Sequence, residues 1–502
     1  MAHLLPVRLI LAAGAFLVAS CQAPPPTPKD EVTGLPAQYE SLQALGAGQR
    51  QDLRQLDTSE LTNRLGRWWE VFNDPVLNEL VSLTIASNWD LQTALQRIEI
   101  ASATVIKSNA MALPLVNFQA IASREAFGRT NKGHSVPILD TFGFGGVVSW
   151  EADVFGRIAS RTQAAQFDLE AVKADRHAIM VTVVADVVAT YAQLRAMQES
   201  LLLRQRYVSV LESQVRLTDS LLVNGLVPVT TVAKIQSEFL QAKASIAPMQ
   251  AGIEVLISTC AILSGGYPRS LDALLKKPGP LLQATLPLPD TLPSQLLKQR
   301  PDIVSQEQTL LAGLSIVDAA NADFMPRFSI PLGVGYNTSP FNLLLSPLSF
   351  AWSIGAGLVA PIYTGGELEA NLRIAQATSK QDQLQYEQLV RQALKEVEDA
   401  VLKYQGVMTE LKLLEAVRAQ QSTVLSQERT LYKTGIIPLF QVNTAELSLI
   451  QSRAAIVAAR YTQASSLALL YKAIGGGWSE PIVSASRGGI EQTANEQRVS
   501  RL

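Results

Sequence analysis

Few side chains in this chain of 502 residues have the types and spacing that chemistry requires. The glycine-rich stretch FGFGG at 142–146 lacks the lysine and the helix start of a phosphate-binding loop, so strand and turn is the better interpretation. The histidines are far apart and form no metal-ligand motif. They are His3, His134 and His177.

A group of carboxylates, Glu396, Glu398 and Asp399, lies in a segment with helical periodicity. Charged neighbours such as Lys395 and Lys403 favour a solvated helix face there over an acid–base pair. The sequence therefore predicts no enzyme activity, no catalytic residues and no metal site.

One cysteine does stand where covalent chemistry is expected. His3 and Arg8 precede an apolar run that is too short to cross a bilayer, so residues 1–20 are predicted to be an export signal. The run ends in VASC, which resembles the lipobox of bacterial lipoproteins, where cleavage before the cysteine is followed by acylation. Cys21 is therefore the predicted lipid attachment site. Apart from this covalent lipid, no cofactor is predicted.

The residue after Cys21 bears on location. Gln22 stands where an Asp would favour retention in the inner membrane in the Gram-negative sorting pattern, so the outer membrane is predicted. The alternative is an ordinary signal peptide with an incidental cysteine. The only other cysteine, Cys260, lies in an apolar helical segment and is expected to be buried and inert.

Composition excludes several classes of protein. With 47% hydrophobic and 17% charged residues the chain can bury a large core, and disorder is excluded. The net charge is -2 and the basic residues are scattered, which argues against nucleic-acid binding. After the signal, no stretch of about 18 apolar residues free of charge occurs. Any crossing of a membrane is therefore expected to use strands.

The sequence repeats itself. A shift of 210 positions places LLVNGLVPV (221–229) on LYKTGIIPL (431–439), and a shift of 212 places Pro114 on Pro326. Matched turns and helix ends in the same order indicate two copies of one structural unit. The predicted parts are an N-terminal lipid-anchored segment (21–72), repeat 1 (73–266), a linker (267–290), repeat 2 (291–476) and a tail (477–502).

Each copy begins with a helical pattern, continues with two alternating segments and ends with a long helical pattern and a shorter one. The expected helices are 74–112, 157–222 and 229–263, then 291–323, 367–432 and 439–474. The expected strands are 115–127 and 140–154, then 328–336 and 350–362. In PRFSIPLGVGY the residues of one strand face are apolar and those of the other are small or polar. This alternation suits the wall of a barrel that faces lipid.

The long helices, about 100 Å each, exceed what a compact domain needs. They are expected to pack as coiled coils against the helices that follow them. Gly225 and Gly435 supply the left-handed residue that ends a helix, and Pro228 and Pro438 suit the first turn of the next one. Each repeated turn is therefore the predicted tip of a helical hairpin.

Four strands cannot close a barrel, and open edges in hydrocarbon cost several kcal/mol per unpaired group. Several copies must therefore share one barrel, with eight strands from a dimer or twelve from a trimer. Eight strands leave a filled interior, whereas twelve leave a lumen. The small residues on the inner face favour the trimer.

Several motifs at these places are familiar together: WWEVFNDPVLNELV (68–81), RPDIVSQEQTLLAG (300–313), APIYTGGELEANL (360–372) and YKTGI (432–436). They resemble the outer-membrane efflux proteins, in particular the lipoprotein branch of the trimeric outer-membrane factors. The resemblance covers about residues 60–480. It implies a homotrimeric twelve-stranded barrel continued by an α-helical periplasmic tunnel. It also implies a periplasmic adaptor and a resistance-nodulation-division transporter as partners, with small molecules or drugs as cargo.

The resemblance also implies functional residues. The hairpin tips are expected to contact the adaptor through Asn224, Gly225, Leu226, Val227 and Pro228, and through Thr434, Gly435, Ile436, Ile437 and Pro438. Relatives line a constriction near the tip with a tyrosine, an apolar residue and an acidic residue, which correspond to Tyr432, Phe440 and Thr444. Thr444 departs from the acidic pattern, so the gate is expected to rely on aromatic packing and on Glu446 or Gln441.

Two alternatives stay open. Related tunnels also serve type I protein secretion. A lipid-anchored periplasmic scaffold or adaptor with a soluble strand sandwich would share the helical patterns.

Overall fold

The structure, a computed structural model, describes residues 66–126, 138–283 and 300–477. The predicted signal, Cys21, most of the N-terminal segment and nearly all of the tail lie outside these residues. Within them the chain forms two compact units. Of the described residues, the first unit contains 96–126, 138–173 and 305–387, and the second contains 66–95, 174–283, 300–304 and 388–477. The two units therefore interleave the predicted repeats instead of following them one after the other.

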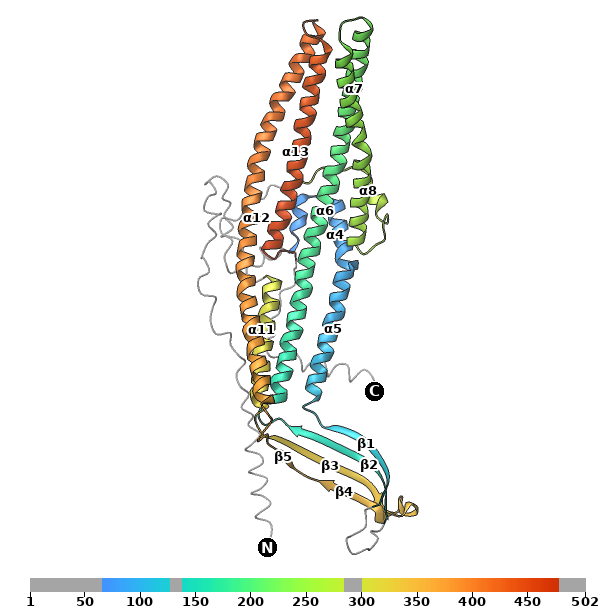
Figure 1. The fold of residues 1–502 in the computed structure, drawn as a ribbon, viewed down its shortest axis with the longest axis vertical. Coiled ribbons are helices and arrows are strands. Elements are labelled where there is room, and N and C mark those ends of the chain that lie inside the picture. Colours follow the sequence, from blue (N-terminus) through green and yellow to red (C-terminus); the bar gives the residue numbers. More distant parts are fainter. Residues whose placement is uncertain (1–65, 127–137, 284–299, 478–502) are drawn as a thin grey trace. The chain divides into compact units, whose positions relative to one another are not determined.

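The first unit contains an antiparallel sheet (Figure 1). Its strand order is β1-β2-β3-β4, with β5 also pairing β3, so the central pair joins β2 of repeat 1 to β3 of repeat 2. The strands are β1 (Leu115–Ala126), β2 (Ile138–Ala152), β3 (Arg327–Thr338), β4 (Phe350–Ile354) and β5 (Gly357–Val359).

One face of this sheet is apolar across every strand, except at one end of β1 and β2, where Arg124 and Asp140 form an ion pair at 3.0 Å. The register places Phe144 opposite Tyr336, and Tyr336 opposite Phe350. Ring centroids 5.4 Å and 5.9 Å apart connect these three side chains, and Phe118 lies 6.3 Å from Phe144. Cross-strand aromatic contacts of this kind stabilise a sheet and fix its register. Because side chains alternate between faces, the opposite face carries most of the glycines and serines of the strands, together with a few apolar side chains such as Ile121 and Val147.

The small face is closely packed at its centre. Gly145 and Gly335 are paired, and a Cβ added to Gly145 would lie 2.4 Å from the Val334 carbonyl oxygen. A Cβ added to Gly335 would lie 2.3 Å from the Phe144 carbonyl oxygen. Only glycine permits so close an approach of two backbones.

The last predicted strand is interrupted. Residues 350–362 were expected as one strand, but β4 ends at Ile354 and β5 spans only Gly357–Val359. Both pair with β3 in the same register, and the gap lies opposite Pro331, which has no N–H to donate to the ladder. Elsewhere the strand ends move by one or two residues, as in β2, which begins at Ile138 instead of 140.

Long helices leave the sheet and others return to it. In chain order they are α4 (Pro75–Ser87), α5 (Trp89–Ala110), α6 (Arg157–Val223), α7 (Val229–Ala244), α8 (Ile246–Leu263), α9 (Asp272–Leu275), α11 (Pro301–Ala322), α12 (Glu367–Lys433) and α13 (Leu439–Ala473). The 3-10 helix η2 (Trp68–Phe72) precedes them. Both α6 and α12 have 67 residues, which gives each a length of about 100 Å.

In the second unit the two helical hairpins pack on each other (Figure 1). Leu203 and Val210 of α6 share a core cluster with Ile450 and Val457 of α13. Within the second hairpin, Leu425 of α12 packs against α13. Apolar side chains spaced by threes and fours along both partners explain these contacts.

Two predicted helices are each broken into two. The helix expected at 74–112 is interrupted at Asn88, whose backbone is extended and whose side-chain oxygen accepts hydrogen bonds from the backbone N–H groups of Asp90 and Leu91. The helix expected at 229–263 is interrupted at Ser245, three residues before Pro248. A proline inside a helix removes a donor and clashes with the carbonyl four residues earlier, which explains the break.

Two described helical segments are long and apolar enough to cross a membrane by length and composition, Arg157–Val223 and Val229–Leu263. The sequence predicts no transmembrane helix, because no stretch of about 18 apolar residues free of charge follows the signal. Half of the apolar window in Arg157–Val223 is buried within the protein, but only 17% of the window in Val229–Leu263 is.

Candidate functional site

The two hairpin tips have the same backbone geometry. Gly225 and Gly435 adopt left-handed φ angles of 70° and 77°. The N–H of the next residue reaches back to the carbonyl five residues earlier, from Leu226 to Leu221 at 2.8 Å and from Ile436 to Leu431 at 3.0 Å. This arrangement satisfies the last carbonyls of the helix and requires a residue that tolerates positive φ.

The residues around each glycine complete the turn. The Asn224 side-chain amide donates to the Ser220 carbonyl at 2.7 Å, and the Thr434 hydroxyl donates to the Leu431 carbonyl at 2.9 Å. Pro228 and Pro438 are the N-cap residues of α7 and α13, one position before the first helical turn that the sequence suggested. Their extended backbone, with φ of -76°, is the one that proline favours.

The apolar tip residues divide into two kinds. Leu226 is 69% exposed and Ile436 is 68% exposed. Val227 and Ile437 are half-buried instead, and Ile437 packs against the cluster of Leu425 with its neighbours on α13. Of the two apolar residues expected to be exposed at each tip, only the first is. At the second tip, Ile437 packs on its own hairpin.

The three predicted constriction residues lie on the surface of the second unit. Tyr432 and Phe440 are 43% and 44% exposed, so neither is a core packing residue within one chain. Thr444 is exposed, and its hydroxyl donates to the Phe440 carbonyl at 2.9 Å, which leaves it no free donor. The contact between Thr444 and Phe440 thus involves the backbone of Phe440 and not its ring.

Glu446, on α13, is the centre of an ion-pair cluster near the tips. Its carboxylate accepts a hydrogen bond from Arg206 Nε of α6 at 2.9 Å and from Arg429 Nη2 of α12 at 2.9 Å. The Glu446 side chain is 13% exposed, whereas the arginines are 59% and 52% exposed. One carboxylate therefore joins the second hairpin to the first. The sequence drew attention to Glu446, but it gave no sign of its partner 240 positions away.

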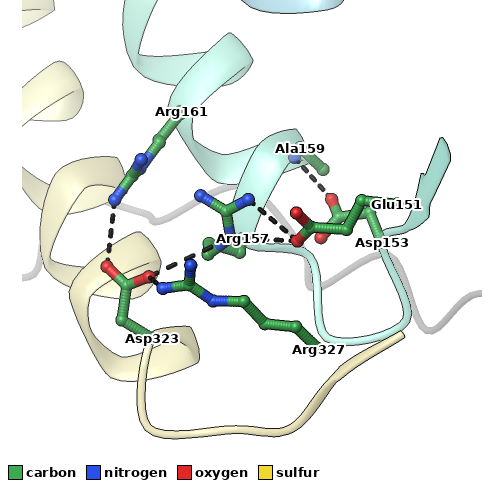
Figure 2. Close-up of polar contacts among 7 residues, drawn as sticks. All are labelled: Glu151, Asp153, Arg157, Ala159, Arg161, Asp323 and Arg327. Carbon is green, nitrogen blue, oxygen red and sulfur yellow. Dashed lines mark hydrogen bonds and ion pairs between the residues drawn. The ribbon is translucent and has the colours of Figure 1, made fainter. Parts of the chain in front are cut away.

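A second polar cluster connects strands to helices in the first unit (Figure 2). Asp323, which follows α11, accepts hydrogen bonds from Arg161 at 2.9 Å and Arg327 at 2.8 Å, and lies 3.9 Å from Arg157. Arg157 also donates to Glu151 at 2.8 Å. Arg157 and Arg161 belong to the first turns of α6, and Arg327 is the first residue of β3. The cluster therefore connects the start of α6 to the segment between α11 and β3.

A third cluster was not predicted. Arg300 donates to the Ala473 carbonyl at 2.8 Å and to Glu396 at 3.0 Å, and its guanidinium also binds Asp302. Burial by itself lowers the pKa of Arg300, but hydrogen bonds and charge from Asp302 and Glu396 outweigh this, so the pKa is raised. The repeat could have indicated this cluster. Position 88 corresponds to 300 by the shift of 212, and Leu263 corresponds to Ala473 by the shift of 210. Asn88 donates to the Leu263 carbonyl at 2.8 Å in the same way.

The described residues contain no group of three or more His, Cys, Asp or Glu that could hold a metal ion. Cys260 is buried, and burial raises the pKa of its thiol to about 12, so the thiolate is suppressed. The candidate functional features are therefore the exposed apolar residues at the hairpin tips and the ion-pair clusters. Such surfaces suit a channel that binds other proteins.

Comparison with known proteins assigns the family. The family model described as outer membrane efflux protein matches residues 80–252 and 292–476. The cation efflux system protein CusC of Escherichia coli O6:H1 is 28% identical over 420 residues, which is 82% of this chain and 88% of CusC. The solvent efflux pump outer membrane protein SrpC of Pseudomonas putida is 27% identical over 477 residues, 94% of this chain and 97% of SrpC.

Solved structures agree. The outer-membrane channel OprN superposes with a TM-score of 0.80 at 25% identity, over 91% of this chain and 100% of OprN. A CusC structure that concerns transmembrane channel formation superposes with a TM-score of 0.71 at 25% identity, over 82% and 94%. These findings confirm the family, the channel function and the outer-membrane location that the sequence predicted. The chain belongs to the outer membrane efflux protein family, and it is an outer-membrane channel of an efflux system.

Proposed function

We propose that this channel is the exit duct of a tripartite efflux system and that it works as a homotrimer with a twelve-stranded barrel. The observation that carries the proposal is the sheet of the first unit. Its apolar face is exposed, with Phe118 75%, Trp352 68% and Ile354 66% accessible. Among the described strands, β1 and the β4–β5 line are sheet edges. Lipid accepts an apolar face but not an open edge, so further copies must supply the missing strands.

The small face supports an open interior. If the apolar face meets lipid, the glycines and serines of the opposite face line the lumen. Twelve strands from three copies leave room for a channel, which eight strands do not.

The cargo class is small solutes. The names of relatives refer to cations, solvent, toluene and pyoverdine, which are all small compared with a folded protein. Small-molecule efflux is therefore favoured over type I protein secretion. The exposed tip residues Leu226 and Ile436 are proposed to contact a periplasmic adaptor that couples the duct to a resistance-nodulation-division transporter. The same proposal includes the signal at 1–20 and the lipid on Cys21.

The test of the duct is reconstitution of the purified chain. We expect a heat-modifiable trimer on gels, and single-channel conductance in planar bilayers. A water-soluble monomer without pore activity after removal of the lipid would support the scaffold alternative and overturn the proposal. Loss of protein secretion with unchanged solute resistance, after deletion of the gene, would support the secretion alternative.

The test of the tips uses Leu226→Ser and Ile436→Ser, alone and together. We expect weaker binding of the cognate adaptor with unchanged conductance, because both side chains are exposed and leave the hairpin core intact. Thr230→Ala, at an exposed polar position just beyond the first tip, is the matched control and should bind normally. Normal adaptor binding by the double variant would exclude these residues from the interface.

A further inference from the structure

The loop between β3 and β4, residues 339–349, is unusually apolar. From Phe328 to Gly366 the sequence contains no Asp, Glu, Lys, Arg or His. The corresponding hairpin loop of repeat 1 carries Arg129, Lys132 and His134. A water-exposed loop ordinarily contains charged residues, so the lack of charge at 339–349 points to other surroundings for this loop.

Large apolar side chains of this loop are exposed. Phe341 is 67% exposed, Leu345 is 77% exposed and Leu348 is 90% exposed. Single exposed apolar residues are normal on protein surfaces, but three within eight positions form a patch that marks contact with another apolar phase.

The backbone of the loop satisfies many of its own polar groups. The Ser349 hydroxyl donates to the Leu343 carbonyl at 2.7 Å, and the Ser346 hydroxyl accepts the Leu348 N–H at 3.3 Å. The N–H groups of Ser346 and Ser349 donate to the carbonyls of Leu343 and Ser346. Internal hydrogen bonds of this kind lower the cost of leaving water.

The loop continues the apolar face of the sheet. The Phe341 ring packs edge-on against Phe142 at a centroid distance of 5.2 Å. Phe142 lies on the same face as Phe144 and Tyr336, because its register partner is Thr338 and side chains two positions apart share a face. The loop joins the strand ends that point away from the helices of this unit (Figure 1).

We propose that the loop of residues 339–349 is an interfacial anchor that inserts Leu345 and Leu348 among the acyl chains of the outer membrane. The proposal rests on the proposed function, in which the apolar face of the sheet meets lipid. Acyl chains are the occupant because the patch is uncharged and continuous with that face. Repeat 2 is thereby held at the membrane boundary.

The experiment places an environment-sensitive fluorophore on single cysteines, Leu345→Cys and Leu348→Cys, in the full-length trimer. The variants are reconstituted in phosphatidylcholine vesicles with or without brominated acyl chains. Asn342→Cys, at an exposed polar position of the same loop, is the matched control. The unsubstituted chain measures background labelling, which should be low because Cys260 is buried and its thiol pKa is about 12.

We expect bromine to quench the probes at 345 and 348 several-fold more strongly than the probe at 342, and aqueous iodide to show the reverse order. Equal quenching by iodide at all three positions would overturn the proposal. Disulfide bonds between Leu345→Cys residues of different copies would also overturn it, because the loops would then cover one another. Pore conductance of the same samples separates the two ideas: absent conductance rejects the duct, and normal conductance with iodide-quenched probes rejects only the anchor.

Discussion

The two helical hairpins share a turn but differ in their return helices and in their ion pairs. Both tips use a left-handed glycine followed by an N-cap proline. Beyond the tip, α13 runs unbroken over 35 residues, whereas its counterpart is divided into α7 and α8 at Ser245. The two predicted repeats thus share the backbone of the turn but differ in their return helices.

The difference extends to the charged contacts. In the second hairpin Glu446 binds Arg429, and it also binds Arg206 of the first hairpin. A shift of 210 places Gln236 and Asp219 at the corresponding positions of repeat 1, and these cannot form the same ion pair. The comparison suggests that the second hairpin is the rigid one and that Glu446 connects it to the first.

The largest expected effect comes from giving α13 the proline of its counterpart. Ala458 occupies the place that Pro248 has in repeat 1, and it is exposed, so only the backbone is tested. Ala458→Pro should lower the free energy of unfolding by about 3 kcal/mol or more. Denaturation of the purified trimer followed by circular dichroism measures it. Pro248→Ala is the control, with a change of about 1 kcal/mol or less. Equal, small changes would contradict the contrast in rigidity.

The next effect concerns the two junctions below the hairpins. Arg300→Met removes the donor to the Ala473 carbonyl and the ion-pair partner of Glu396, and should cost about 3 kcal/mol. Asn88→Ala removes one helix cap and one contact to the Leu263 carbonyl, and should cost about 1 to 2 kcal/mol. Urea denaturation of both variants measures the difference. Similar losses would mean that the charge of Arg300 adds nothing to the junction.

A smaller effect should be the same in both hairpins. Gly225→Ala and Gly435→Ala each force a side chain into a left-handed backbone that has open space around it, with nothing within 4 Å of the added Cβ. We expect each to cost about 1 kcal/mol from backbone strain alone. Thermal denaturation of the two variants should give matching shifts. Unequal shifts would show that the two turns differ in backbone strain despite their matching geometry.

The smallest effect on stability is expected at Glu446, where conductance should nevertheless change. Glu446→Gln weakens two ion pairs whose arginines are more than half exposed, so less than about 1 kcal/mol of stability should be lost. We expect the conductance of reconstituted trimers to rise, because the link between hairpins is loosened. Glu415→Gln is the control, since Glu415 pairs with Arg460 inside the second hairpin. A rise in both variants would argue against a special role of the link.

Local patterns predicted much of the fold. Alternation in PRFSIPLGVGY marked β3, and the periodic segments marked α6 and α12 to within one residue at each end. Breaks were missed where one residue outweighs the pattern around it, as Pro331, Pro248 and Asn88 do. Each acts through hydrogen bonding of a particular backbone group, which periodicity does not report.

The sequence by itself determined the elements, the turns and the family, because helix period, strand alternation and a left-handed glycine are local properties of the chain. Only the tertiary structure decided which side chains meet. Asp323 meets Arg161 across 162 positions, and Glu446 meets Arg206 across 240. Contacts at such separations depend on strand register and on how helices pack, and both result from the whole fold and not from any single segment.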